Sequence, residues 1–432
     1  MQITILALGS RGDVQPAVAL GVGLSRAGHA VRLGSYAQFA DLAAEHGLAF
    51  APIAGDMQAL LQSEEGRAVL DSGNPLRLIQ MLRGFVRDTV AQTWADIKAA
   101  CVQAQALVSI TTVYYPAEVV ATTQGLPHIN AQLQPLLPTG AFHSPLLPAP
   151  LLRTPILNRA SHHLSELLYW QALRGVVNGV RGEAGLAPLP WRPTLSRAVQ
   201  NGMLTLYAYS PLVVPTPDDW PPSAAVTGFW FLDPPAGYEP PADLARFLAA
   251  GEPPVYIGFG SMNTRDPRRT GELALRALEL SGRRGVLMRG WGGLDARTVP
   301  ASVFLLDDVP HAWLFPQLAV VVHHGGPGTT AAGLRAGKPS VLMPFFGDQP
   351  FWSERLVRLG VAPEPIPQRR LTAERLARAI EAATAPGVRM RAAAVGQSIA
   401  AEDGVGLAVK QIERALGAAR TAKVSGVYNV PS

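Results

Sequence analysis

The residues best suited to chemistry lie in one glycine-rich stretch of the C-terminal half. An apolar run at 318–322 is followed by His323, His324 and a loop of glycines and one proline. Short β-branched runs are typical of buried parallel strands. Thr329 or Thr330 predicts the cap of a helix that follows. A strand, a glycine loop and a helix N-terminus in this order bind anions, because unpaired N–H groups and the positive end of the helix dipole face the loop. We therefore expect a diphosphate at this loop.

The loop differs from two better-known phosphate motifs. A P-loop is excluded because Gly333 and Gly337 are too close together, and because Pro339 follows Lys338 where Ser or Thr is needed. The G-x-G-x-x-G fingerprint fits neither here nor at residues 9–12. A nicotinamide dehydrogenase is therefore a distant alternative.

Strands and helices that alternate regularly along the chain must position this loop. The N-terminal pattern predicts strands at 3–8, 30–34 and 48–53 and helices at 16–27 and 39–46. Such β-α-β-α-β order predicts a parallel sheet with right-handed crossovers.

A second α/β series follows a proline-rich linker. It predicts strands at 254–259, 286–288, 303–306, 318–322 and 341–343, and helices at 372–384 and 387–416. Loops after parallel strands converge on one sheet edge, where open sheets bind ligands. Ser261 and Trp291 follow two of these strands. Ser261 is a candidate hydrogen-bond donor to a diphosphate or a helix cap, and Trp291 is a candidate base-stacking or packing residue.

The middle of the chain is less regular. Apolar spacing predicts an amphipathic helix over 75–105, which covers a sheet or an acceptor cleft, with a membrane-surface role as the alternative. Leucines and prolines at 133–157 predict a loop lining an apolar cavity.

Composition indicates two globular domains. The chain has 432 residues, 48% hydrophobic and 16% charged, with a net charge of +5. No dense Lys/Arg run is present, so we expect no nucleic-acid partner. A single cysteine, Cys101, and the lack of a signal-peptide pattern or an apolar run of about 18 residues predict a soluble cytoplasmic protein.

Two segments carry a family resemblance. Residues 324–330 (HGGPGTT) and 344–352 (PFFGDQPFW) resemble the donor-sugar signature of the GT-B nucleotide-sugar glycosyltransferases, the UDP-glycosyltransferase superfamily (family 1), nearest to its sterol-type and antibiotic-type bacterial branch. Residues 9–16 (GSRGDVQP) resemble the N-terminal motif of that branch. The likeness is strong over 1–30 and 254–352 and thin over 60–215.

The resemblance implies an α/β fold of two facing Rossmann-like domains with an interdomain cleft and a C-terminal helix that crosses back. The N-terminal, acceptor-binding domain would span 1–215, a linker 216–240 and the donor-binding domain 241–400. The crossing helix would occupy about 400–417.

The resemblance also implies site residues. Asp13 would be the general base, and its alternative role is a helix N-cap. Donor contacts would come, beside Ser261 and Trp291, from the backbone of Val309 and from His324, Gly326, Gly328, Thr329, Asp348 and Gln349. Arg11, Gly12 and His143 are further candidate diphosphate or acceptor contacts. His323 is expected to point into its domain or to cap a backbone group.

The expected reaction is an inverting transfer of a hexosyl group from a nucleotide sugar to a hydroxyl of a lipophilic acceptor such as a sterol, a polyketide or a phenol. Ala332 stands where plant relatives carry a ribose-binding glutamate, so UDP, which we favour, and dTDP both remain open. We expect no cofactor and no catalytic metal, since no D-x-D triplet or His/Cys cluster occurs. The rivals are a sugar-nucleotide epimerase or hydrolase and a non-catalytic auxiliary partner protein. The pattern does not set the oligomeric state.

Overall fold

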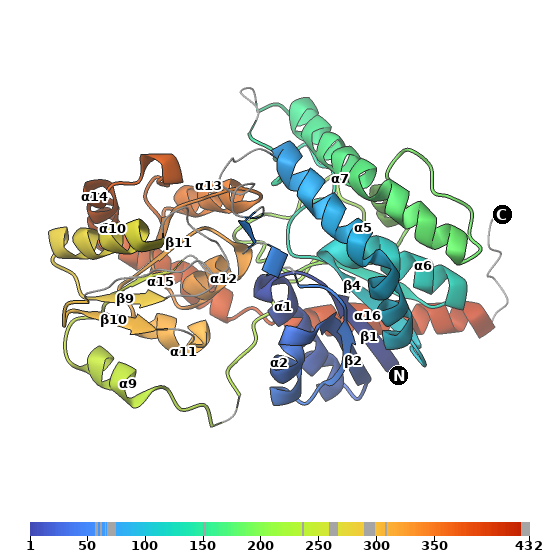
Figure 1. Ribbon diagram of the computed structural model, residues 1–432, viewed down its shortest axis with the longest axis horizontal. Coiled ribbons are helices and arrows are strands. Elements are labelled where there is room, and N and C mark those ends of the chain that lie inside the picture. The colour runs from blue at the N-terminus through green and yellow to red at the C-terminus, as the bar shows by residue number, and fades with distance from the viewer. Residues whose placement is uncertain are drawn as a thin grey trace.

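The chain folds into two α/β domains that lie side by side (Figure 1). The computed structural model describes residues 1–56, 59–60, 63–64, 66, 75–149, 153–235, 237–258, 267–288, 299–306 and 309–424. Each domain is built on a parallel sheet with helices packed against it, as expected from the alternation of apolar strands and amphipathic helices.

The first sheet has seven strands in the order β3-β2-β1-β4-β5-β6-β7, and all neighbours are parallel. The strands are β1 (Gln2–Ala7), β2 (Ala30–Tyr36), β3 (Ala49–Ile53), β4 (Ala106–Ile110), β5 (His128–Gln132), β6 (Thr205–Tyr207) and β7 (Ala224–Val226). The three strands predicted near the N-terminus are present. Strand β7 lies inside the predicted linker 216–240, so the first sheet extends into that segment.

The second sheet has five parallel strands in the order β10-β9-β8-β11-β12. They are β8 (Val255–Ile257), β9 (Gly285–Met288), β10 (Val303–Leu306), β11 (Val320–His323) and β12 (Ser340–Leu342). All five coincide with predicted apolar runs, because both faces of a parallel sheet are covered and its strands are therefore continuously apolar.

The helices of the first domain are α1 (Arg11–Arg26), α2 (Ala40–Glu45), α5 (Pro75–Ala100), α6 (Tyr114–Gln124), α7 (Pro155–Glu183) and α8 (Leu195–Gln200). Those that follow are α9 (Ala242–Ala249), α10 (Pro267–Leu280), α11 (His311–Leu314), α12 (Pro327–Arg335), α13 (Gln349–Leu359), α14 (Ala373–Ala383), α15 (Pro386–Ala400) and α16 (Gly404–Val424). Short 3-10 turns occur at 37–39, 111–113, 315–317 and 368–370.

Two helices begin at other residues than predicted. Helix α1 begins at Arg11 rather than at Pro16, because Ser10 is the N-cap and its N–H bonds to the side chain of Asp13. Helix α12 begins at Pro327 with Gly326 as its N-cap, so neither Thr329 nor Thr330 is the cap. Proline at the first helical position is favoured because its missing N–H would have no intrahelical acceptor.

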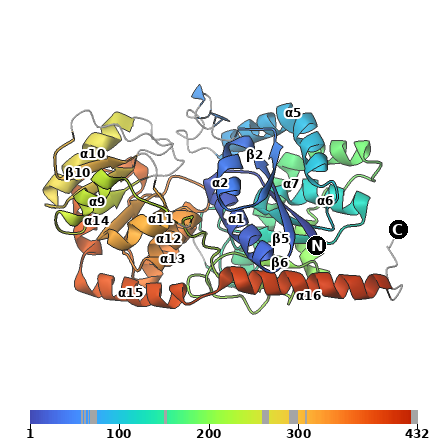
Figure 2. The ribbon, with the colours of Figure 1, turned by 90° about the horizontal axis from the view of Figure 1, so that it is seen from below.

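The C-terminal helix crosses back, as the resemblance implied. The segment predicted as one helix over 387–416 is two helices, because the chain turns at residues 401–403 between α15 and α16. Figure 2 shows α15 under the second domain and α16 running beneath the first. Ala408, Ile412 and Leu416 join the core of the first domain. The approach to α1 is close, since a Cβ on Gly23 would lie 2.3 Å from Cγ1 of Val405.

Among the described residues, no helix combines the length and the hydropathy needed to span a bilayer.

Leu416→Ala tests how much the crossing helix contributes to stability. Leu416 is 3% exposed in the first-domain core, so its truncation should lower the free energy of unfolding by about 2–5 kcal/mol. Leu407→Ala on the same helix is the matched control, because Leu407 is 41% exposed and should cost well under half as much. Urea unfolding measures both, and equal losses would show that α16 does not stabilise the first domain through this face.

Candidate functional site

The two domains meet where the N-termini of α1 and α12 face each other. Helix α1 follows β1 and helix α12 follows β11, so both begin at the carboxyl ends of central strands. A Cβ placed on Gly328 would lie only 3.9 Å from Cα of Gly12. Both views place these helices side by side (Figures 1 and 2). At this distance the two helix starts are in van der Waals contact.

The start of α12 presents backbone donors. Pro327 has no N–H, and the N–H of Thr330 already bonds to the carbonyl of Gly326 at 3.0 Å. The N–H groups of Gly328 and Thr329 therefore have no acceptor within the helix. The hydroxyl Oγ1 of Thr330 is buried and has no hydrogen-bond partner among the described residues. This helix end can bind an anion through Gly328 and Thr329.

His324 lies directly against the helix start. Its Nε2 would be only 2.3 Å from a Cβ on Gly326, so glycine is required at the N-cap for this ring position. The ring is 9% exposed, and its Nδ1 is buried without a partner in the described part of the chain. Burial lowers the pKa of His324 to about 4. The imidazole is therefore neutral at pH 7 and offers one N–H to a ligand, not a positive charge.

His323 has a structural role, as expected. It is fully buried, and its Nδ1 accepts a hydrogen bond from the N–H of Gly325 at 3.1 Å. Gly325 has a φ of +90°, which favours glycine because other residues are strained there. Burial lowers the pKa of His323, so its ring also remains neutral. His323 therefore fixes the turn that carries His324.

Asp13 is the carboxylate of the first domain at this meeting point. It is half-buried in the first turn of α1, and its Oδ2 accepts hydrogen bonds from the N–H and the hydroxyl of Ser10 at 2.9 and 3.1 Å. Burial raises its pKa to about 6 against the opposing effect of these bonds, and the charge of Asp348 raises it further. A carboxylate with this pKa is ionised at pH 7 and still basic enough to accept a proton.

Asp348 brings a second carboxylate from the other domain. It is the N-cap of α13, and its Oδ2 accepts a hydrogen bond from Trp352 Nε1 at 2.8 Å. Gln134, which follows β5 in the first domain, bonds to it as well. Burial raises the pKa of Asp348. The two domains thus place two carboxylates close to the start of α12.

Gln349 and Val309 have buried side chains. The Oε1 of Gln349 accepts the N–H of Phe345 at 2.7 Å and that of Phe346 at 3.3 Å, so this oxygen holds the loop before α13. The side chain of Val309 packs in an apolar cluster of the second domain. Ser261 and Trp291 lie outside the described residues.

Arg11 and His143 differ in burial and in position. Arg11 is exposed, and its Nε donates to Gln15 Oε1 at 3.4 Å along α1. His143 is buried in the loop before α7, with its ring 5.8 Å from that of Phe351. Gly12, Asp13, His324, Gly326, Gly328, Thr329 and Asp348 gather around the two helix starts. His143 lines a separate hollow.

Two neighbours of the carboxylates were not predicted. Tyr36 ends β2, and burial together with the charges of Asp13 and Asp56 raises its pKa to about 12. Gln134 lies just beyond the carboxyl end of β5. The signal for both was their position at the carboxyl end of a parallel strand, on the sheet edge where Asp13 also lies.

Comparisons with known proteins show the family of this chain. Residues 3–122 match the glycosyltransferase family 28 N-terminal domain, and residues 290–411 match the erythromycin biosynthesis protein CIII-like C-terminal domain. A sterol 3-beta-glucosyltransferase of Arabidopsis thaliana is 37% identical over 96% of this chain and 68% of its own length. The O-mycaminosyltylonolide 6-deoxyallosyltransferase of Streptomyces fradiae is 36% identical over 99% of this chain and 100% of its own.

A solved structure shares the fold. The glycosyltransferase VinC in complex with DTDP superposes with a TM-score of 0.67 at 18% identity, covering 96% of this chain and 100% of its own. With this coverage, the similarity extends over both domains.

Asp13→Asn tests the burial of this carboxylate. The pKa is about 6 in the folded chain against 3.8 for the unperturbed group, so wild type loses stability as pH rises from about 4 through about 6. Asparagine removes that loss. The variant should therefore gain on the order of 1–3 kcal/mol relative to wild type between pH 4 and pH 8.

Urea unfolding at the two pH values measures this gain. Asp41→Asn is the matched control, because Asp41 is exposed in the first turn of α2, and it should show no comparable gain. A pH-independent difference for Asp13→Asn would mean that the carboxylate is not desolvated.

Proposed function

This chain belongs to the GT-B nucleotide-sugar glycosyltransferases, and we propose that it is an inverting enzyme that moves a hexosyl group from a nucleoside-diphosphate sugar to a hydroxyl of a lipophilic acceptor. One observation carries the proposal: the Asp13 carboxylate of one domain lies close to the anion-binding start of α12 in the other. A base in one domain that faces a leaving-group site in the other suits a direct displacement at a sugar carbon.

In the proposed step, Asp13 takes the proton of the acceptor hydroxyl. The freed oxygen forms a bond to the anomeric carbon while the bond from that carbon to the diphosphate oxygen breaks. The bonding electrons leave with the nucleoside diphosphate. Attack from the side opposite the leaving group inverts the anomeric centre.

The leaving diphosphate would be stabilised by dipoles. The N–H groups of Gly328 and Thr329, the positive end of α12 and one N–H of neutral His324 are oriented before the reaction, so they need little rearrangement as charge develops. Among the described residues, no three His, Cys, Asp or Glu side chains lie together as metal ligands would. We propose that transfer proceeds with these groups and without a cofactor.

The donor sugar would lie between the two carboxylates. Asp348, held by Trp352 and Gln134, is positioned to accept hydrogen bonds from sugar hydroxyls. Gln349 is proposed to help chiefly by shaping the loop at 345–346, since its Oε1 is already bonded there. Val309, Ser261 and Trp291 are proposed for the base and diphosphate.

We favour a UDP-sugar as donor and a sterol, polyketide or phenol as acceptor. The likeness to a sterol 3-beta-glucosyltransferase supports this choice. The likeness to a 6-deoxyallosyltransferase and to a structure solved with DTDP supports a dTDP-deoxysugar as the alternative donor. Ala332 carries no group that could bond to the ribose, so it favours neither nucleotide.

Gly326→Ala tests the diphosphate site. The new Cβ would displace Nε2 of His324, so affinity for UDP or dTDP should fall about tenfold or more, as it should in His324→Ala. Gly333→Ala, in the same helix, is the matched control, because its Cβ would meet only Ser340 Oγ at an ordinary 3.6 Å. Calorimetric titration with each nucleotide measures the change. If Gly326→Ala bound the nucleotides as tightly as Gly333→Ala does, His324 would not belong to the site.

Asp13→Asn tests the base. Transfer should fall by about 10²–10⁴ in kcat, while the affinity for the donor nucleotide stays within a few-fold of wild type. Wild-type kcat/KM should rise with pH through about 6 as Asp13 loses its proton. Turnover is measured by release of nucleotide with and without acceptor. Retained transfer in the variant would restrict Asp13 to capping α1, and release without acceptor would favour a hydrolase.

A further inference from the structure

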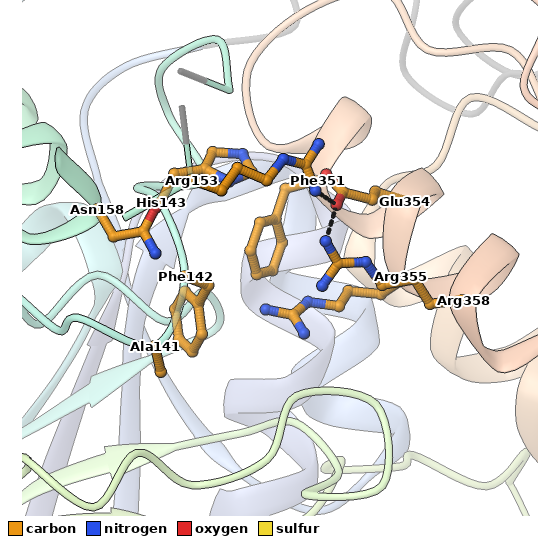
Figure 3. A pocket seen from close by; sticks show the side chains of 9 residues that line it. All are labelled: Ala141, Phe142, His143, Arg153, Asn158, Phe351, Glu354, Arg355 and Arg358. Carbon is orange, nitrogen blue, oxygen red and sulfur yellow. Dashed lines mark hydrogen bonds and ion pairs between the residues drawn. The ribbon is translucent and has the colours of Figure 1, made fainter. Parts of the chain in front are cut away.

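A hollow lies at the interface between the two domains, and none of the residues that line it belongs to the helix starts of α1 and α12. It has a volume of about 100 Å³. The first domain contributes the loop at 141–143, Arg153 and the first turn of α7, and the second contributes one face of α13 (Figure 3). None of these side chains belongs to the donor site described above, although that site includes the first turn of α13.

The charges around this hollow do not balance. Three guanidinium groups, Arg153, Arg355 and Arg358, line it with a single carboxylate, Glu354. Both Arg153 and Arg358 bond to Oε1 of Glu354, the first from across the domain seam and the second along α13. Glu354 is therefore shared by two cations, and an excess of positive charge remains.

Arg355 carries part of that excess. Its guanidinium lies between two aromatic rings, with Cζ 4.9 Å from the ring centroid of Phe142 and 4.8 Å from that of Phe351. Within the described ranges it forms neither a hydrogen bond nor an ion pair, so its fork of N–H donors is unused. Burial and the neighbouring Arg358 lower its pKa to about 10, as expected for a poorly solvated cation without its own counter-ion.

A buried acceptor lies on the opposite wall. Asn158, 6% exposed, donates from Nδ2 to the carbonyl of Gly140 at 2.9 Å. Its Oδ1 is buried and has no partner among the described residues. An unsatisfied buried oxygen is costly unless a ligand or water supplies a hydrogen. The hollow thus offers unused donors on one wall and an unused acceptor on the other.

We propose that this hollow binds a compact phosphate group, held in a fork by Arg355 of the second domain and reached by Arg153 of the first. The volume equals that of about three water molecules, which suits a small oxyanion. Guanidinium groups match phosphate oxygens in paired hydrogen bonds, and their weak hydration favours such sites at interfaces. A phosphate here would link the two domains next to α13. This site is additional to the sugar-nucleotide function and does not depend on it.

Titration of the full chain with inorganic phosphate, in a phosphate-free starting buffer, tests the site by calorimetry. Wild type should bind saturably, and Arg355→Gln should bind about tenfold more weakly or worse. Arg192→Gln is the matched control, because Arg192 also lies over an aromatic ring, Trp191, but outside the hollow, and it should bind as wild type does. Arg355→Lys keeps the charge without the fork and should recover part of the affinity.

His324→Ala separates this site from the helix start of α12. Phosphate binding that persists in His324→Ala and is lost in Arg355→Gln supports the proposal. Binding lost in His324→Ala and unchanged in Arg355→Gln would assign the phosphate to the donor site and overturn it. Absence of saturable binding to wild type would overturn it as well. Thermal unfolding of each variant confirms that the compared chains are folded.

Titration with glycerol 3-phosphate shows whether the hollow binds free phosphate or a phosphate ester. If the ester binds more tightly than inorganic phosphate and Asn158→Ala removes the difference, a hydroxylated phosphate ester occupies the hollow and Asn158 Oδ1 accepts its hydroxyl. Equal affinities, both lost in Arg355→Gln, would indicate free phosphate at the same site. Either result supports the proposed pocket.

Discussion

The structure depends on the close opposition of two helix N-termini across the domain seam. Helix dipoles of this orientation would repel each other in an apolar contact, since both ends carry partial positive charge. The arrangement is acceptable because anionic groups surround it: the carboxylates of Asp13 and Asp348, and in the proposed complex a diphosphate. The two helix starts are in van der Waals contact, since a Cβ on Gly328 would lie 3.9 Å from Cα of Gly12.

Contacts outside the site hold the two domains together. Helix α16 leaves the second domain after α15 and places its apolar face in the core of the first domain. Around the turn between them, Glu402 accepts a hydrogen bond from Ser210 at 2.6 Å. At the other side of the seam, α13 contacts the loop before α7 through Phe142, Phe351 and the shared Glu354. These contacts bring Asp13 and α12 together without using the residues that do the chemistry.

Burial sets the protonation states in the site in opposite directions. A desolvated carboxylate becomes more basic, so Asp13 reaches a pKa of about 6. A desolvated imidazole becomes less basic, so His324, with a pKa of about 4, is neutral at pH 7. In the proposed reaction, the same physical effect would suit Asp13 to accept a proton in one domain and His324 to donate a hydrogen bond to the diphosphate in the other.

Much of the fold was predictable because its signals are local. Apolar runs of parallel strands, glycine loops and proline-rich breaks depend on neighbouring residues, so β1 to β3 of the first sheet and all five strands of the second followed from the sequence, as did the family resemblance around His324 and Asp13. Strands β4 to β6 were not predicted, and β7 lies in the segment predicted as a linker. Helix starts were less reliable. The cap at Ser10 depends on a bond to Asp13 that competes with the breaking tendency of Pro16, and Gly326 has no side chain to mark a cap.

The tertiary structure alone decided which residues from distant parts of the chain meet. No spacing along the sequence relates Gln134 to Asp348 or Gly12 to Gly328, because each pair joins different domains. It also decided that Gln349 turns its oxygen to the backbone, and that Arg355 lies between two aromatic rings with no ion-pair partner among the described residues. The sequence by itself determined the elements and the candidate chemistry, since these depend on local propensity and residue type. Packing between the domains determined pKa values and partners, since desolvation and distance exist only in the folded chain.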